Sequence, residues 1–356
     1  MEIGETAPEY TQARAAVIDS RPSFSFSDGV PSHTSLMDNL AHTLAGAALG
    51  QAGLRKKTGL GMATLMIAAN LPDIDAVTMF LDRGSLYFRR GWTHGPIALL
   101  LLPVLLALAM QAFDRWQARR GNRPAARAPV KFRWVLALAY IGILSHPLMD
   151  FLNTYGIRCL MPFSERWFYG DALFIIDLWV WSAFGLGLWL SRRRERRTGA
   201  EHPKPALIAV IAVVTYASAM GLAGLWVEGY VARAVERAGL GAPVTVVASP
   251  VPINPFRRDV IFDLGGTYGF GAFAWAPGPE LALDPELVPA NMNDPAIARA
   301  AAYDRCIADF LYWSRLPFAD VRRDEGGVHV TIGDARYNRR PGEGRFIVRT
   351  TLPAAP

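Results

Sequence analysis

Residues 95–113 read GPIALLLLPVLLALAMQAF, and residues 205–227 read PALIAVIAVVTYASAMGLAGLWV. Neither run contains a charged side chain, and each is long enough, at about 1.5 Å per residue, to cross a bilayer core of about 30 Å. Neither has the polar face that a helix on the surface of a soluble protein needs. The two runs therefore predict membrane-spanning helices and argue against a soluble all-α core.

Four further segments are apolar but shorter or interrupted. They are Leu40–Gly53, Thr58–Pro72, Trp134–Met149 and Ala172–Ser191. The first is rich in Ala and Gly, which suits tight packing between helices more than contact with lipid. We therefore expect an all-α polytopic membrane bundle over 37–230, with about five spanning helices plus one short helix.

The composition limits the class of protein further. Hydrophobic residues make up 51% of the 356 residues and charged residues 19%, which excludes a disordered chain and gives no reason to expect direct nucleic-acid binding. The two cysteines, Cys159 and Cys306, are too few for a disulfide framework or a Cys-rich zinc site.

The basic residues predict the orientation in the membrane. Segment 114–133 has a net charge of +6, segment 191–205 has +4, and 55–57 adds three positive charges. The net charge of segment 153–171 is zero. Basic loops stay in the cytoplasm. We expect a multi-pass protein of the bacterial inner membrane with these three loops inside and the C-terminal region outside.

The two ends of the chain differ from this middle part. Segment 1–36 has no apolar signal-peptide core and carries five acidic residues, so we expect a disordered, outward-facing extension. From 242 to 356 the pattern changes to short β-branched and aromatic runs, with a hairpin signal at Gly265-Gly266 and helical spacing over Ala296–Leu316. This pattern predicts a small soluble α+β domain.

Polar residues interrupt the membrane segments, where they are costly and by default functional. With the predicted orientation, all of them fall in the outer half of the bundle. They are His42, Asn70, Asp73, Asp75, Arg89, Arg90, His94, His146, Asp150, Asn153 and Asp177.

Their chemistry predicts a metal site. His146 and Asp150 are one helical turn apart on one face. Together with His42, His94 and Asp73 they form a set of N and O ligands without thiolates, which suits one or two divalent transition metal ions, Zn²⁺ or else Mn²⁺ or Fe. We expect Asn70, Asn153 and Asp177 to lie next to these ligands and to fix their orientation.

Simpler interpretations exist for the individual residues. A histidine at a helix end is often structural, and Asp177 could simply pair with an arginine of a neighbouring helix. Arg89 and Arg90 could be anchors at the membrane interface. Three histidines and three aspartates are predicted to lie at the same depth in the membrane, and this convergence favours the metal site.

The motifs around these residues resemble the YdjM-like family of membrane-bound metal-dependent hydrolases, also described as LexA-binding inner-membrane-associated hydrolases. The matching segments are 37–46, Pro-Asp-Ile-Asp at 72–75, Arg-Gly-Trp-Thr-His-Gly at 90–95, His-Pro-Leu-Met-Asp at 146–150, 153–156, 252–258 and 313–318. The resemblance implies a hydrolase and leaves its substrate open. The His-x-x-x-Asp element is also similar to one in zinc-dependent phospholipases C, which would point to a phosphoester.

We therefore expect metal-assisted hydrolysis of an ester, in an amphiphilic or lipid-linked substrate at the bilayer surface. The metal would activate water. Asp75 would orient or deprotonate that water, and Arg89 and Arg90 would neutralise the developing charge. The alternatives are a non-catalytic, metal-stabilised scaffold or regulator that presents the C-terminal domain to a partner, and, less favoured, a transporter. An intramembrane metalloprotease is excluded because no histidine is followed by glutamate.

Overall fold

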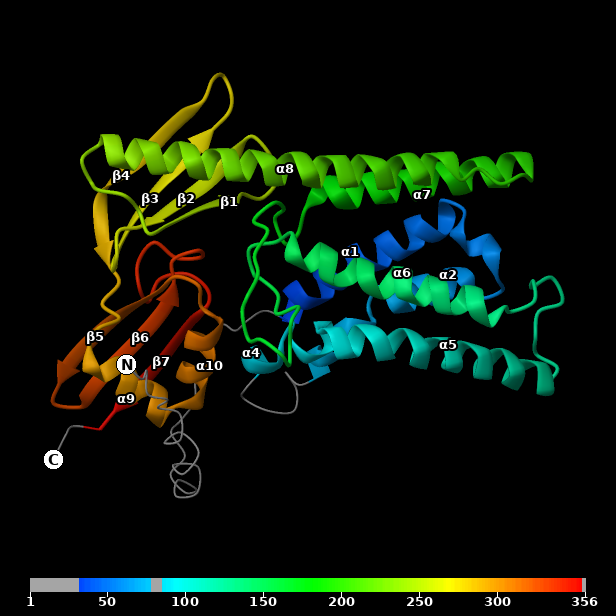
Figure 1. Cartoon of the computed structure of the whole chain (residues 1–356), viewed down its shortest axis with the longest axis horizontal. Helices are drawn as coiled ribbons and strands as arrows, with labels where there is room; N and C mark the ends of the chain where they lie inside the picture. Colours follow the sequence, from blue (N-terminus) through cyan, green and yellow to red (C-terminus); the bar gives the residue numbers. More distant parts are fainter. Residues whose placement is uncertain (1–31, 78–84, 354–356) are drawn as a thin grey trace, which may run out of the picture.

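The computed structural model describes residues 32–77 and 85–353. They form an elongated helical bundle and, beyond one end of it, two antiparallel sheets (Figure 1). The predicted extension 1–36 lies outside the described residues except for 32–36, which begin the first helix. The helical elements of the bundle are α1 (Ser32–Gln51), η3 (Leu54–Lys57), α2 (Gly61–Ala68), η4 (Leu71–Val77), α4 (Ser85–Phe88), η5 (Trp92–His94), α5 (Pro96–Arg119), α6 (Phe132–Phe151), α7 (Leu178–Thr198) and α8 (Lys204–Arg237).

Among the described helices, α5, α6 and α8 are long and apolar enough to cross a membrane. The prediction of five spanning helices plus one short helix is therefore wrong. The expected second span is cut short at both ends. Leu60 has a left-handed backbone, so that α2 starts only at Gly61, and the helix ends at Ala68, after which the chain continues as the 3₁₀ segment η4. The expected fifth span is also too short, because α7 begins after Asp177 and becomes strongly basic from Arg192.

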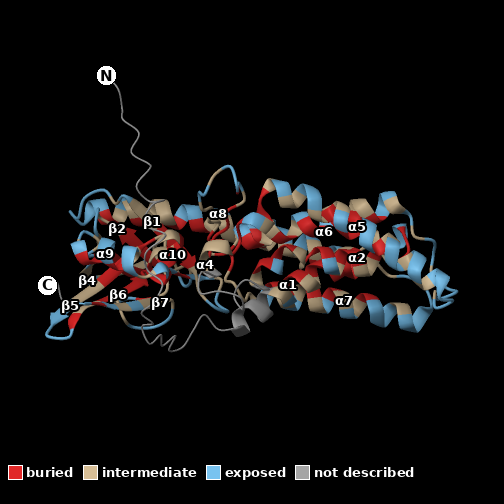
Figure 2. Cartoon of the chain, turned by 90° about the horizontal axis from the view of Figure 1, so that it is seen from below, coloured by how far each residue is buried: buried red, intermediate tan, exposed pale blue. Residues whose placement is uncertain are grey.

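The short α2 is held by close packing between α1 and α6 (Figure 2). A Cβ atom on Gly46 of α1 would lie 2.7 Å from the carbonyl oxygen of Leu65, and one on Gly142 of α6 would lie 2.5 Å from the Cβ of Ala68. Leu65 and Ala68 are fully buried. Small residues on the two long helices therefore let the backbone of α2 approach both of them.

The three basic segments meet at the end of the bundle that lies away from the sheets (Figure 1). Arg55 forms an ion pair with Glu195 at 2.7 Å, which joins the segments that follow α1 and α7. The Thr58 hydroxyl accepts a hydrogen bond from the Lys131 amide at 2.7 Å, which joins the segment that precedes α6. The charge pattern predicted that these segments share one side of the membrane; which side that is stays a prediction.

Helix α8 connects the bundle to the sheets without a break. Its 34 residues span about 51 Å at 1.5 Å per residue, more than a bilayer core of about 30 Å. Beyond its long apolar part, Val227, Val231 and Val235 are buried against Val260 and Phe273 of the first sheet. The same helix therefore serves both regions.

The C-terminal region is rich in sheet. One sheet has the order β1-β2-β3-β4 and the other the order β5-β6-β7, with two short helices packed on the second. The single helix expected over Ala296–Leu316 is instead divided, because Asp304 leaves the helical backbone and caps the second helix by accepting a hydrogen bond from the Cys306 amide. The expected hairpin at Gly265-Gly266 joins β2 and β3. These elements are β1 (Thr245–Pro250), β2 (Arg257–Asp263), β3 (Thr267–Ala274), β4 (Glu280–Pro289), α9 (Pro295–Tyr303), α10 (Arg305–Trp313), β5 (Pro317–Asp324), β6 (Gly327–Asp334) and β7 (Ile347–Leu352).

Candidate metal centre

Three local structures bring the candidate ligands together at the end of the bundle nearer the sheets. After α2 the chain continues as the 3₁₀ segment η4, which carries Asp73 and Asp75. His94 ends the short η5 segment just before α5. His146 and Asp150 lie one turn apart in the last part of α6. Segments far apart in the chain thus contribute to one site.

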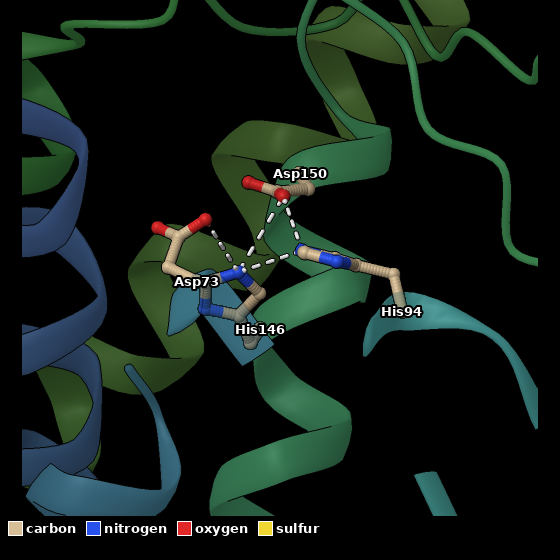
Figure 3. Close-up of side chains that lie close together, drawn as sticks. All are labelled: Asp73, His94, His146 and Asp150. Carbon is tan, nitrogen blue, oxygen red and sulfur yellow. Dashed lines mark hydrogen bonds and ion pairs between the residues drawn. The ribbon is translucent and has the colours of Figure 1, made fainter. Parts of the chain in front are cut away.

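Asp73, His94, His146 and Asp150 form a compact, buried group (Figure 3). Each offers one ligand atom, and these four atoms lie within 4.8 Å of one another. The two Nε2 atoms of His94 and His146 are 3.1 Å apart, and they lie 3.3 Å and 3.5 Å from Oδ2 of Asp150. Oδ1 of Asp73 lies 3.7 Å from Nε2 of His146. Such a group could hold a metal ion.

The outer nitrogen of each histidine ring has a hydrogen-bond partner. Nδ1 of His146 lies 2.7 Å from the carbonyl oxygen of Ala69, which can only accept a hydrogen bond, so this nitrogen carries a proton. Thr93 donates to Asp75 and lies 2.9 Å from Nδ1 of His94, so its hydroxyl accepts from that nitrogen. In the neutral rings both Nε2 atoms therefore present lone pairs to the centre, as in metal-binding histidines.

His42, a predicted ligand, contacts the group from α1. Its ring stacks on that of His146 with a centroid distance of 3.8 Å, and its Nε2 lies 3.3 Å from Oδ1 of Asp150. His42 thus pairs with Oδ1 of Asp150, whereas His94 pairs with Oδ2 of the same carboxylate. The structure thus places His42 beside the four-residue group, in contact with Asp150.

Asp75 and the two arginines surround the group. Nη1 of Arg89 bridges Asp73 at 3.0 Å and Asp75 at 2.6 Å, while Nη2 of Arg90 pairs with Asp150 at 3.1 Å. Burial alone would lower the pKa of Arg89, but the charges of Asp75 and Asp73 outweigh it and raise the pKa above its ordinary value. Asp75 also lies 3.6 Å from Nδ1 of His94. Its expected role toward a metal-activated water stays a prediction.

Arg90 has an unusual backbone. Its φ angle is 50°, in the left-handed region that bulky residues avoid. Both backbone groups are held there, since its amide donates to Oδ2 of Asp75 at 2.7 Å and its carbonyl accepts from the Arg158 amide at 2.9 Å. The next residue must be small, because a Cβ atom on Gly91 would lie 2.7 Å from the guanidinium of Arg158. Strain of this kind is concentrated at functional sites.

A second set of residues holds the arginines from the side of the sheets. Oδ1 of Asn153 accepts from Arg90 at 3.0 Å, and the Arg90 guanidinium lies 4.9 Å from the centre of the Tyr155 ring. The fully buried Arg158 donates to the carbonyl of Arg89 at 3.1 Å and to the Tyr312 hydroxyl of α10 at 2.8 Å. Of these residues, sequence reasoning identified only Asn153. Arg158 is one of two arginines in segment 153–171, and no local pattern distinguishes it there.

The side chains of two predicted supporting residues form their described hydrogen bonds away from the candidate ligands, although the backbone carbonyl of Asn70 accepts from the Asp73 amide at 3.2 Å. Asn70 donates its side-chain amide to Thr43 of α1 at 2.9 Å and so ties α1 to the end of α2. Asp177 caps the start of α7, accepting from the Val180 amide at 3.1 Å, and also accepts from the Tyr216 hydroxyl at 3.2 Å. Asp177 therefore serves as the N-cap of α7, and its role beside the metal site stays a prediction.

The donor atoms of the site also fit a cation. The buried carboxylates of Asp73 and Asp75 pair with Arg89, and that of Asp150 pairs with Arg90. Their oxygens, together with the two inward lone pairs of the neutral imidazoles, make this donor set suitable for a divalent metal ion.

Fold and site together define a membrane protein with three apolar helices and a buried Asp/His centre. The chain belongs to the family described as YdjM inner membrane protein, whose model matches residues 37–227, more than half of the chain. This confirms the resemblance seen in the motifs, and the matched residues include all of the candidate ligands.

One curated relative, described as "Uncharacterized protein YfhP" of Bacillus subtilis (strain 168), is 30% identical over 141 residues, which are 37% of this chain and 39% of the relative. The chain thus spans about two fifths of the length of that relative. No solved structure matches this chain.

Proposed function

We propose that this protein is a membrane-bound metal-dependent hydrolase that cleaves a phosphoester in an amphiphilic or lipid-linked substrate. The observation that carries the proposal is the pairing of the buried Asp/His group with Arg89 and Arg90, each within 3.1 Å of its carboxylates. Asp73, His94, His146 and Asp150 would hold the ion, which we propose to be Zn²⁺, with Mn²⁺ or Fe as alternatives and one or two ions. Such an ion activates water and polarises an ester oxygen.

The residues of the chain itself supply the remaining functions. Asp75, through Thr93 and its contact with His94, orients the imidazole toward the centre. Arg89 and Arg90 each have a planar guanidinium, which suits the equatorial oxygens of a phosphoryl group. Both pair with carboxylates in this structure, and with those carboxylates holding a cation the two guanidinium groups would bind an anionic substrate instead.

A small cavity beside the centre supports an amphiphilic substrate. Asn153, which holds Arg90, and Asp177 line this cavity together with apolar side chains of α1, α6, α7 and the preceding loop, among them Ala41, Met149 and Val180. The polar end of a substrate would lie toward Asn153 and its apolar part along the apolar residues. The cavity lies next to exposed, apolar helix surfaces.

The test is turnover together with metal content. The full chain is purified in detergent, loaded with metal and given a panel of phospholipids and lipid-linked phosphates. We expect metal-dependent release of product by the wild type and none by His146→Ala. Arg90→Ala should retain metal but react about 10²–10³-fold more slowly, the usual loss for one electrostatic contact to the transition state.

Full metal occupancy without any release would instead favour the non-catalytic scaffold that presents the C-terminal sheets to a partner. Arg90→Lys serves as the matched variant, because it keeps the positive charge and loses only the planar fork.

A further inference from the structure

The loop between β1 and β2, residues 251–256, carries large apolar side chains that face outward. Ile253 and Phe256 are 63% and 59% exposed, and beside them at the start of α7 Leu178 and Trp179 are 42% and 53% exposed. We name these four residues the interface patch. The indole nitrogen of Trp179 donates to the carbonyl of Ile253 at 2.8 Å, so the loop is fixed against α7.

The position of this loop along α8 gives its depth in the membrane. Arg258, at the base of the loop, is buried and donates to the carbonyl of Met220. Met220 is 16 residues after Lys204, the start of α8, which corresponds to about 24 Å along the helix. Ile253 lines a small cavity together with Tyr216, one turn earlier on α8. The loop therefore lies within the roughly 30 Å that the apolar part of α8 would occupy in lipid.

Exposed apolar side chains of α8 continue past the level of the loop. Leu222 and Leu225, which lie beyond Met220 toward the sheets, are 69% and 67% exposed, and Trp226 is 44% exposed. The first charged residue after this apolar stretch is Glu228. These exposed apolar side chains lie farther toward the sheets than the loop does. The loop is therefore at a level of α8 where the helix still exposes apolar side chains.

From these observations we propose that the interface patch is inserted into the boundary between headgroups and acyl chains of the bilayer. Its occupant is membrane lipid, and the exposed Arg257 next to Phe256 would reach lipid phosphates. The C-terminal region would then contact the membrane directly, in addition to its connection through α8. The proposal concerns a surface apart from the metal centre and does not depend on hydrolysis.

The test measures the surroundings of residue 256 in the full chain. Phe256→Cys is made in a Cys159→Ser, Cys306→Ala background, labelled with an environment-sensitive dye and reconstituted in phosphatidylethanolamine/phosphatidylglycerol nanodiscs. Nitroxide groups placed high on the acyl chains should quench this dye, whereas iodide in the water should not. Glu325→Cys, in the turn between β5 and β6, is the matched control and should show the reverse.

Quenching of the dye at 256 by iodide alone would show a water-facing patch, and protection from both quenchers would show a protein partner or a second copy. Either result overturns the proposal. A second measurement keeps the native cysteines: p-benzoylphenylalanine at 256 preserves an aromatic side chain and should cross-link to phospholipid under light, seen as a mass increase. The same group at 325 should not, and lack of any lipid adduct at 256 would count equally against the proposal.

Discussion

Among the described residues, a buried network of opposite charges lies in the sheets and another lies in the bundle. In the sheets, Asp334 is fully satisfied: its two oxygens accept from the Ser314 hydroxyl, the Arg315 amide, and the backbone and guanidinium of Arg336. In the bundle, the carboxylate of Asp150 pairs with Arg90 and also faces two imidazole nitrogens, which present lone pairs when the rings are neutral. Burial of charge alone therefore does not mark a site. What distinguishes the candidate metal centre is that its acceptors converge on one another.

The largest effect should come from removing a candidate ligand. His146→Ala should abolish metal binding, because it removes a nitrogen that lies within 3.5 Å of two other candidate ligands. The metal content of the purified protein, measured by elemental analysis, gives the result. His329→Ala, which alters an exposed histidine of β6, should keep the metal of the wild type. Equal metal content in both variants would show that the four-residue group is not the site.

The network in the sheets should respond through stability instead. Asp334→Ala leaves the buried guanidinium of Arg336 without its carboxylate, and breaking such a pair costs about 3–5 kcal/mol. Denaturant unfolding followed by tryptophan fluorescence can report this loss, since Trp313 lies against Arg336. Metal content should stay at the wild-type level. Loss of metal from this variant would mean that the two networks depend on each other.

The same carboxylate determines the acid sensitivity of the sheets. Burial would raise the pKa of Asp334, but the charge of Arg336 and several hydrogen bonds outweigh it and hold the pKa below its ordinary value. A lowered pKa in the folded state contributes stability above the unfolded pKa of about 3.9, and this contribution is lost as the pH falls through the folded pKa. Asp334→Asn should remove that part of the pH dependence of unfolding.

A smaller effect should follow from changing Asp75, which lies next to His94 but does not belong to the four-residue group. Asp75→Asn keeps the size of the side chain but removes the negative charge near Nδ1 of His94, and such changes weaken metal affinity by about 10–100-fold. Competition with a chelator of known affinity measures the change. Asp284→Asn on the exposed surface of β4 is the control. An unchanged affinity in Asp75→Asn would limit Asp75 to holding Arg89 and the Arg90 backbone.

The smallest effect is expected at Asp177. Asp177→Ala removes the cap of α7 and should cost about 1 kcal/mol of stability, with metal content unchanged. Thermal unfolding in detergent, together with elemental analysis, separates the two quantities. A loss of metal here would support the predicted role of Asp177 beside the metal site.

The sequence predicted the composition of the centre better than the path of the chain. His146 and Asp150 are recognisable because helical spacing puts them on one face, and the polar residues of η4 and η5 stand out against apolar surroundings. The length of α2 was not predictable in the same way, because the uncharged run 58–72 contains no charge to mark its end. Two backbone features shorten the helix, the left-handed Leu60 at its start and the change to the 3₁₀ segment η4 after its end, and hydropathy reports neither.

The residues that hold Arg89 and Arg90 from the side of the sheets could not be predicted from the sequence either. Tyr155 and Arg158 act through contacts with residues near the far end of the chain, and neither belongs to a local pattern. Asp177 is the opposite case. An aspartate directly before the helical run from Leu178 is a capping signal, and its local meaning deserved more weight than its depth in the membrane.

Tyr155 has a consequence for the order in which the protein is made. Its ring lies over Arg90 and at the same time belongs to the core formed by Ile297, Phe310 and Trp313. A ribosome delivers the four candidate ligands early and the residues that enclose Tyr155 last. A nascent or truncated chain therefore carries every ligand before the wall behind Arg90 exists. Completion of the centre is thereby delayed until the final strands of the protein have been synthesised and folded.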